Sequence, residues 1–297
     1  VVFLAGVFLK LAKPVLVPFC MAVLLSLALS PVLDFLVARK VPKPLALVGI
    51  LLLTIVVLFL IGSLFYSSGK SFAAELPSFN EMMKSALASA EENLPGPRLK
   101  AEVMGWISGL NAEKVGGLIL SALGPFVSFA SELLLVFVFM IFILAGRGRM
   151  EKKITQAFSP DQALAVARTV SKIDRQVQRY LAVKTLVCVI TGVLTAAVLA
   201  VFGLPFALVF GVLAFLLNYI PTLGSIIATV PPILMAAFYF GSIGRAIGIL
   251  ALLAAINVIL GNFVEPRLMG KGLGLSPLLV FFSLFFGSWL WGIPGMI

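Results

Sequence analysis

Residues 218–225 interrupt a region that is otherwise apolar from residue 204 to residue 240. Pro221 has no backbone N–H and Gly224 has no side chain, so this segment can leave backbone carbonyls and amides without helical partners. The segment also carries three uncharged side chains that form hydrogen bonds: Asn218, Thr222 and Ser225. Together these groups could bind a small polar molecule. The alternative is an ordinary tight turn between two helices.

A second polar cluster lies at residues 257–274, after a later apolar stretch. Asn257 and Asn262 precede Glu265, and Pro266 follows it directly. Arg267 is close enough in sequence to pair with the Glu265 carboxylate. The functional interpretation is a polar cluster at the mouth of a cavity, or a proton or cation site. The structural alternative is an ion pair in a surface loop.

Two other acids lie near the ends of apolar segments. Glu132 is close to the start of an apolar stretch, and Asp34 is close to the end of another. Either carboxylate could join Glu265 in a proton or cation path, although a position at the surface is the alternative for both.

The distribution of charge along the chain indicates which structural elements hold these polar side chains. Hydrophobic residues make up 61% of the chain and charged residues 11%, and residues 45–66, 133–146 and 185–244 carry no charge. Runs of about 20 apolar residues match the roughly 30 Å hydrocarbon thickness of a bilayer. Barrel strands would be short and would alternate apolar with polar residues. The sequence therefore predicts an all-α polytopic membrane protein with about eight to nine apolar helical segments.

The predicted organisation has five parts. They are the N-terminal spans (1–66), extracytoplasmic amphipathic helices (67–117), a span (118–146), a cytoplasmic basic amphipathic helix (147–184) and a C-terminal core with broken helices (185–297). Within the core, the segment 205–220 would be about 24 Å long as a helix, which is short for a crossing. Segments 205–220 and 222–240 could therefore cross fully or form a re-entrant pair. We expect Pro231 and Pro232 to break the second of them.

Basic residues predict the orientation. The net charge is +10, and Lys and Arg gather at 39–43 and 147–184. Cytoplasmic loops of membrane proteins are rich in Lys and Arg, so both loops should be cytoplasmic, together with 262–274. Within 147–184 a basic stripe lies opposite an apolar one, which suits an anionic membrane surface; attraction of a substrate is the alternative. The stripe consists of Arg168, Lys172, Arg175 and Arg179.

Several chemistries are not indicated. The chain has no histidine, and it lacks the HExxH, GxSxG and GxxxxGK[ST] signatures. Cys20 and Cys188 lie far apart in apolar stretches, where cysteine acts as a small hydrophobe. We therefore predict no enzymatic activity, no cofactor and no metal site. A membrane protein accounts for the positive charge without a nucleic-acid partner.

A weak internal repeat links the two halves of the C-terminal core. Residues 203–205 (Gly-Leu-Pro) open an apolar run that ends at Ile220-Pro221, with Gly224 after it. Residues 274–277 (Gly-Leu-Ser-Pro) open another run, which ends at Ile293-Pro294, with Gly295 after it. The predicted orientations of the two runs are opposite. Opposed copies of one element build the central site of many transporters.

Several of these motifs resemble the autoinducer-2 exporter family of bacterial permeases. The resemblance is specific over about residues 175–297 and rests on layout before them. It is carried by Arg179-Tyr180-Leu181, Gly203-Leu204-Pro205-Phe206-Ala207, Asn218-Tyr219-Ile220-Pro221-Thr222-Leu223-Gly224, Glu265-Pro266-Arg267-Leu268-Met269-Gly270, Leu275-Ser276-Pro277 and Gly292-Ile293-Pro294-Gly295. It implies a bacterial inner membrane and a homo-oligomer, with five subunits as the expected number. Some family members are regarded as exporters of autoinducer-2, and others as sodium or lithium/proton antiporters.

Three hypotheses follow. The leading one is a permease for a small polar organic solute, for which the resemblance suggests autoinducer-2. Its binding site would include Asn218, Pro221, Thr222, Gly224, Ser225, Asn257, Asn262, Glu265 and Pro266. The alternative is a sodium or lithium/proton antiporter that uses Glu265, Glu132 or Asp34. The third is a membrane scaffold that transports nothing; loss of solute flux in Asn218→Leu or Gly224→Leu, with assembly retained, would argue against it.

Overall fold

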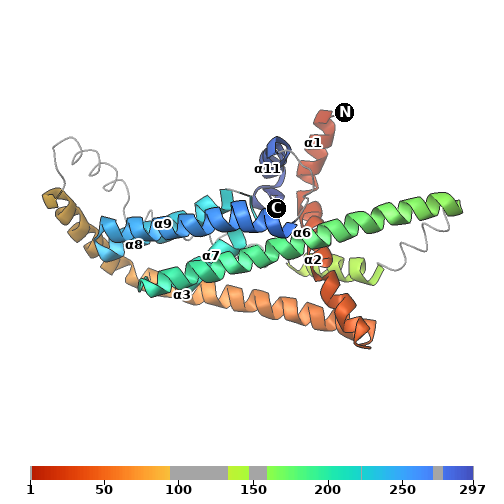
Figure 1. Cartoon of the computed structure of the whole chain (residues 1–297), viewed down its shortest axis with the longest axis horizontal. Coiled ribbons are helices and arrows are strands. Elements are labelled where there is room, and N and C mark those ends of the chain that lie inside the picture. The colour runs from red at the N-terminus through yellow and green to blue at the C-terminus, as the bar shows by residue number, and fades with distance from the viewer. Residues whose placement is uncertain (1, 94–132, 147–158, 222, 270–276, 297) are drawn as a thin grey trace. The chain divides into compact units, whose positions relative to one another are not determined.

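The computed structural model describes residues 2–93, 133–146, 159–221, 223–269 and 277–296 (Figure 1). No strand occurs among these residues, which confirms the predicted all-α fold class. The elements are α1 (Val2–Leu11), α2 (Lys13–Ala38), α3 (Lys43–Asn93), the helix Leu133–Gly146, α6 (Pro160–Val201), α7 (Ala207–Leu217), α8 (Leu223–Phe240), α9 (Ile243–Ile259), the π-helix η1 (Leu260–Val264), α10 (Glu265–Met269), α11 (Pro277–Trp291) and the 3-10 helix η2 (Ile293–Met296).

Four helical segments within the described residues are long and apolar enough to cross a membrane. They are Lys13–Ala38, Lys43–Ser68, Asp161–Val201 and Gly244–Met269. Shorter apolar helices occupy Leu133–Gly146, Ala207–Leu217, Leu223–Ala237 and Phe281–Trp291. These segments fall close to the spans that the charge-free stretches predict, so the polytopic organisation is confirmed.

The surfaces of these helices are themselves apolar. Phe59 and Phe142 are each 72% exposed, and Val201 is 86% exposed. Many other large apolar side chains of α2, α3, α9 and α11 are also exposed. Soluble proteins rarely expose contiguous apolar surface on this scale. Lipid tails can cover such surface without penalty, since they are as apolar as the side chains.

Two helices continue past their predicted ends. Helix α3 runs on from its apolar part as far as Asn93. Helix α6 has 42 residues, so it joins the basic amphipathic segment and the following apolar span in one helix about 63 Å long. The remaining residues of the predicted 67–117 segment, and the stretches 118–132, 147–158 and 270–274, lie outside the described residues.

The predicted break at Pro231 and Pro232 is wrong. Both prolines lie inside α8, which is helical from Leu223 to Phe240. Each proline removes one helical hydrogen bond. However, α8 packs against both α7 and α9 along its length, and both prolines are buried. Packing between neighbouring helices commonly keeps proline-containing membrane helices intact.

The chain divides into two compact units, which we describe separately. The first comprises residues 1–58, 128–185 and 266–297. Its main core joins α2, the start of α3 and the helix Leu133–Gly146. The fully buried members are Ala22 and Leu33 of α2, Ala46 and Ile50 of α3, and Val136, Met140 and Leu144. The second unit comprises residues 59–127 and 186–265.

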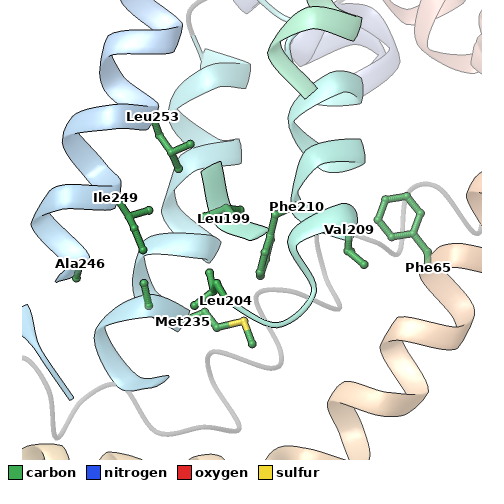
Figure 2. Packing of buried hydrophobic residues seen from close by; sticks show 10 residues of the cluster. Phe65, Leu199, Leu204, Val209, Phe210, Met235, Ala246, Ile249 and Leu253 are labelled. Atoms are coloured by element: carbon green, nitrogen blue, oxygen red, sulfur yellow. The ribbon is translucent and has the colours of Figure 1, made fainter. Parts of the chain in front are cut away.

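The core of the second unit gathers side chains from five helices (Figure 2). Phe65 comes from α3 and Leu199 from the end of α6, while Phe210 lies on α7. Met235 of α8 and Ile249 of α9 complete the centre. Burial of these side chains fixes how α7, α8 and α9 pack. Three polar residues of the predicted site lie on these same helices: Asn218 at the end of α7, Ser225 on α8 and Asn257 on α9.

Candidate functional site

A close helix crossing brings α6 and α7 together. Gly192 of α6 and Gly211 of α7 face each other, and a Cβ atom on either would lie 2.7 Å from the carbonyl oxygen of the other. Only glycine permits this approach of two backbones, a feature common in membrane helix pairs. The crossing places the α6 face that carries Cys188 and Thr191 beside the C-terminal end of α7.

The turn between α7 and α8 depends on a second close approach. Asn218 caps α7, and its backbone N–H donates to the Ala214 carbonyl. A Cβ atom on Gly224 would overlap the Leu217 carbonyl, so only glycine fits at the start of α8. Pro221 lies in the turn, where a missing N–H breaks no helical hydrogen bond. This geometry brings the first turn of α8 beside Asn218, whose side chain contacts α6.

The Asn218 side chain joins three segments through hydrogen bonds. Its Nδ2 donates to Thr191 Oγ1 at 3.3 Å and to Cys188 Sγ at 3.6 Å. Its Oδ1 accepts a hydrogen bond from Ser225 Oγ at 3.2 Å. Thr191 Oγ1 in turn donates to the Val187 carbonyl at 2.8 Å. The amide of Asn218 therefore uses hydrogen-bonding groups of both α6 and α8.

The same hydrogen bonds continue to α9. Thr229 Oγ1 donates to the carbonyl of Ser225, one turn earlier in α8, at 2.6 Å. Asn257 Nδ2 of α9 then donates to Thr229 Oγ1 at 3.2 Å. We call Thr191, Asn218, Ser225, Thr229 and Asn257 the Asn218 network. It crosses the second unit from α6 through α8 to α9.

The Asn218 network is electrically neutral and changes in burial along its length. Thr191 and Asn218 are 3% and 8% exposed, whereas Ser225, Thr229 and Asn257 are half-buried. Arg245 is the only charged residue between residues 186 and 264, and its guanidinium lies over the Phe240 ring at 5.4 Å. The network itself carries no charge, so its half-buried end can bind a solute through hydrogen bonds alone. The nearest charged residue on α6 is Lys184, which is buried one turn before Cys188.

The remaining predicted residues of the second cluster lie beyond α9. Asn262 is exposed within η1, and Glu265 is half-buried at the start of α10. The backbone N–H of Glu265 bonds to the Leu260 carbonyl, five residues earlier. Pro266 explains this widened register, since its ring would clash with the Asn262 carbonyl in a regular α-helix. Short π-helices of this kind often occur at functional sites.

Other predicted positions are not part of the network. Asp34 is exposed on α2, while Thr222 and Glu132 lie outside the described residues. The basic stripe is exposed along α6 at Arg168, Lys172, Arg175 and Arg179. Among the described residues, no group of three His, Cys, Asp or Glu side chains gathers as a metal site would require.

The structure connects three residues that the sequence singles out, Asn218, Ser225 and Asn257, and adds two that it does not. Thr191 and Thr229 are the additions, and both had a usable signal. Thr229 follows Ser225 by four residues and so lies on the same face of α8. Thr191 is a polar residue within a charge-free span, a position that often marks a functional contact.

These features define a polytopic helical membrane protein with an uncharged hydrogen-bond network that links its helices. The sequence model of the AI-2E family transporters matches residues 1–297, and the chain belongs to this family. Family membership and the candidate spans make it a multi-pass protein of a bacterial inner membrane.

Two relatives from Escherichia coli (strain K12) match the whole chain. "AI-2 transport protein TqsA" is 32% identical over 300 residues, which cover 100% of this chain and 85% of the relative. "Putative transport protein YhhT" is 30% identical over 297 residues, covering 100% of this chain and 84% of the relative. The resemblance inferred from the C-terminal motifs is thereby confirmed at the level of the family.

Proposed function

We propose that this transporter moves a small, uncharged, polar organic solute across the membrane and that the Asn218 network binds this solute. The observation that carries the proposal is the neutral line of hydrogen bonds from Thr191 to Asn257. Amide and hydroxyl groups match a sugar-like solute better than an ion, because they bind it without a countercharge. Autoinducer-2 is the first solute to test, since one relative is named an AI-2 transport protein.

A flux assay tests the proposal. The full chain is reconstituted in vesicles, and autoinducer-2 flux is measured with and without ion gradients. We expect wild-type flux above that of protein-free vesicles, and a loss of about 100-fold in Asn218→Leu, since the leucine leaves several polar groups unpaired. Thr195→Val is the control because Thr195 is buried on α6 outside the network, and its flux should stay within about twofold. Equal flux in wild type and Asn218→Leu would overturn the proposal.

The same vesicles address cation coupling. Neither Glu265 nor Asp34 belongs to the Asn218 network. Glu265 is half-buried and Asp34 is exposed. We expect the Glu265→Gln variant still to transport the solute, and we expect this flux still to require Asn218. A sodium or lithium flux that Glu265→Gln abolishes and Asn218→Leu spares would instead favour the antiporter.

The proposed orientation places the loops at 39–43, 147–184 and 262–274 in the cytoplasm, since these carry the basic residues. The exposed stripe of Arg168, Lys172, Arg175 and Arg179 would then face anionic lipid headgroups or the water beside them. Cysteines introduced at Arg168 and Lys40 should react with an impermeant thiol reagent only from the cytoplasmic side. A homo-oligomer, expected from the family resemblance, is tested by crosslinking in the native membrane.

A further inference from the structure

The hydrogen bonds of the buried half of the Asn218 network can point in only one direction. A threonine hydroxyl has a single hydrogen, and Thr191 gives it to the Val187 carbonyl, which can only accept. Thr191 Oγ1 must therefore accept from Asn218, so the amide nitrogen of Asn218 faces α6. Asn218 Oδ1 then faces α8, and the Ser225 hydroxyl has to donate its only hydrogen to that oxygen.

The half-buried part of the network obeys the same rule. Thr229 gives its only hydroxyl hydrogen to the Ser225 carbonyl, so its oxygen must accept from Asn257. This fixes the Asn257 amide with Nδ2 towards Thr229 and Oδ1 away from it. Thr229 thus decides which end of the Asn257 amide a solute meets.

Most of the hydrogen-bonding positions that the network does not use itself are acceptors. The hydroxyl hydrogens of Thr191, Ser225 and Thr229 are all used within it. Among the described residues, no donor occupies Asn257 Oδ1 or the second lone pairs of Ser225 Oγ and Thr229 Oγ1. One N–H of Asn257 is the only donor left on these side chains. These three residues are half-buried, so they form the more exposed end of the network.

We propose that Thr229 is a specificity-determining residue that makes this site accept hydrogen bonds rather than donate them. The inference rests on the proposed function and deepens it. A solute with O–H groups can satisfy the free lone pairs of Ser225, Thr229 and Asn257. An ether built on the same carbon chain and an organic anion without hydroxyls offer acceptors only, so they leave those lone pairs unpaired. Sites built to bind a hydroxyl reject analogues that lack it.

The test compares three labelled four-carbon probes in vesicles containing the full chain. Erythritol has four hydroxyls, its tetra-O-methyl ether keeps the oxygens without the hydrogens, and succinate carries two carboxylates and no hydroxyl. Autoinducer-2 is measured beside them, and flux through protein-free vesicles is subtracted from each value. We expect protein-dependent flux of erythritol to exceed that of the ether and of succinate by about tenfold or more. Equal flux of erythritol and its ether would overturn the proposal.

Substitutions at Thr229 show whether this residue sets the ratio of erythritol flux to ether flux. Thr229→Val removes the hydroxyl and frees the Asn257 amide to rotate, so the ratio should fall towards one. Thr229→Ser keeps the hydroxyl and should retain the ratio even if total flux drops. Thr195→Val is the matched control, since Thr195 is a buried threonine outside the network. A ratio unchanged in Thr229→Val would overturn the role of Thr229.

The outcomes distinguish this proposal from the one on which it rests. If none of the four solutes shows flux that depends on the protein and on Asn218, the proposed function fails and this inference fails with it. If flux depends on Asn218 but does not distinguish hydroxyls from ethers, the proposed function stands and only the specificity assignment is overturned.

Discussion

The turn after α7 and the turn after α11 share one design. In each, an apolar helix ends and the chain folds back on itself through an Ile-Pro pair, with a glycine pressed against the preceding helix. Gly224 lies against the Leu217 carbonyl in the first turn, and Gly295 lies against the Gly287 carbonyl in the second. The sequence repeat predicts this likeness, since both runs end in Ile-Pro with a glycine following.

The side chains around the two turns differ in kind. The α7–α8 turn carries Asn218 and Ser225, whose hydrogen bonds reach side chains on α6 and lead on to α9. At the α11–η2 turn, Trp291 Nε1 donates to the backbone carbonyl of Leu9 in α1 at 3.2 Å. Beside it, the Lys10 ammonium lies over the Trp289 ring at 5.3 Å.

The comparison indicates that the shape of a turn and its function depend on different residues. Proline and glycine give both turns their shape, because they remove a donor and a side chain where the chain must reverse. The partners of the neighbouring side chains then decide what each turn does. One turn presents neutral side-chain groups that a solute could share, whereas the described contacts of the other join α11 to a backbone carbonyl and a lysine of α1. The proposed site therefore lies at the first turn only.

The largest expected effect tests the shared design. Gly224→Ala would place a Cβ atom on the Leu217 carbonyl, and Gly295→Ala would do the same at the Gly287 carbonyl. We expect each to destabilise the protein by about 3 kcal/mol or more, since the backbone cannot move away without opening the turn. Thermal unfolding of the purified protein measures this cost.

Gly248→Ala is the control for both glycine variants. Gly248 lies inside α9 with no atom within 4 Å of a built Cβ. Alanine there should be neutral or stabilise the helix by up to about 1 kcal/mol. If Gly224→Ala behaved like Gly248→Ala, the tight turn described here would be wrong.

Local patterns predicted most of the helices, because charge-free runs and Pro/Gly positions act over a few residues. The segments 205–220 and 222–240 match α7 and α8 within a few residues. The same local reasoning predicted a break at Pro231 and Pro232, and this prediction is wrong. Packing of α8 against α7 and α9 stabilises a helix that the two prolines alone would interrupt.

The site was only partly predictable for a related reason. Asn218, Ser225 and Asn257 stand out as polar residues among apolar ones. Their connection depends on the Gly192–Gly211 crossing, which joins residues far apart in the chain. No periodicity within one helix reveals such a contact, so the part played by Thr191 needed the structure.

A smaller effect tests the α7–α8 turn alone. Thr191→Val removes the oxygen that accepts a hydrogen bond from Asn218 Nδ2. A buried N–H of Asn218 then loses this acceptor. We expect a cost of about 1–3 kcal/mol in stability, because an unpaired buried donor loses its hydration without compensation. Solute flux should fall several-fold as the Asn218 amide loses its fixed direction.

Thr195→Val supplies the matched comparison for Thr191→Val. Thr195 is also buried on α6, one turn further along and outside the network. Its replacement should change stability by less than about 1 kcal/mol and leave flux at the wild-type level. Equal losses in the two variants would mean that α6 packing, rather than the hydrogen bond to Asn218, sets the effect.

The smallest effect distinguishes the two turns most directly. Trp291→Phe keeps an aromatic ring but removes the N–H that bonds to the Leu9 carbonyl. We expect a stability loss of about 0.5–1.5 kcal/mol, the usual net value of one hydrogen bond, with flux and solute selectivity unchanged. Unfolding midpoints and vesicle flux on the same preparation measure both. A change in solute selectivity in Trp291→Phe as large as that in Thr229→Val would show that the second turn also contacts the solute. Loss of a structural hydrogen bond alone should lower stability without altering which solutes cross.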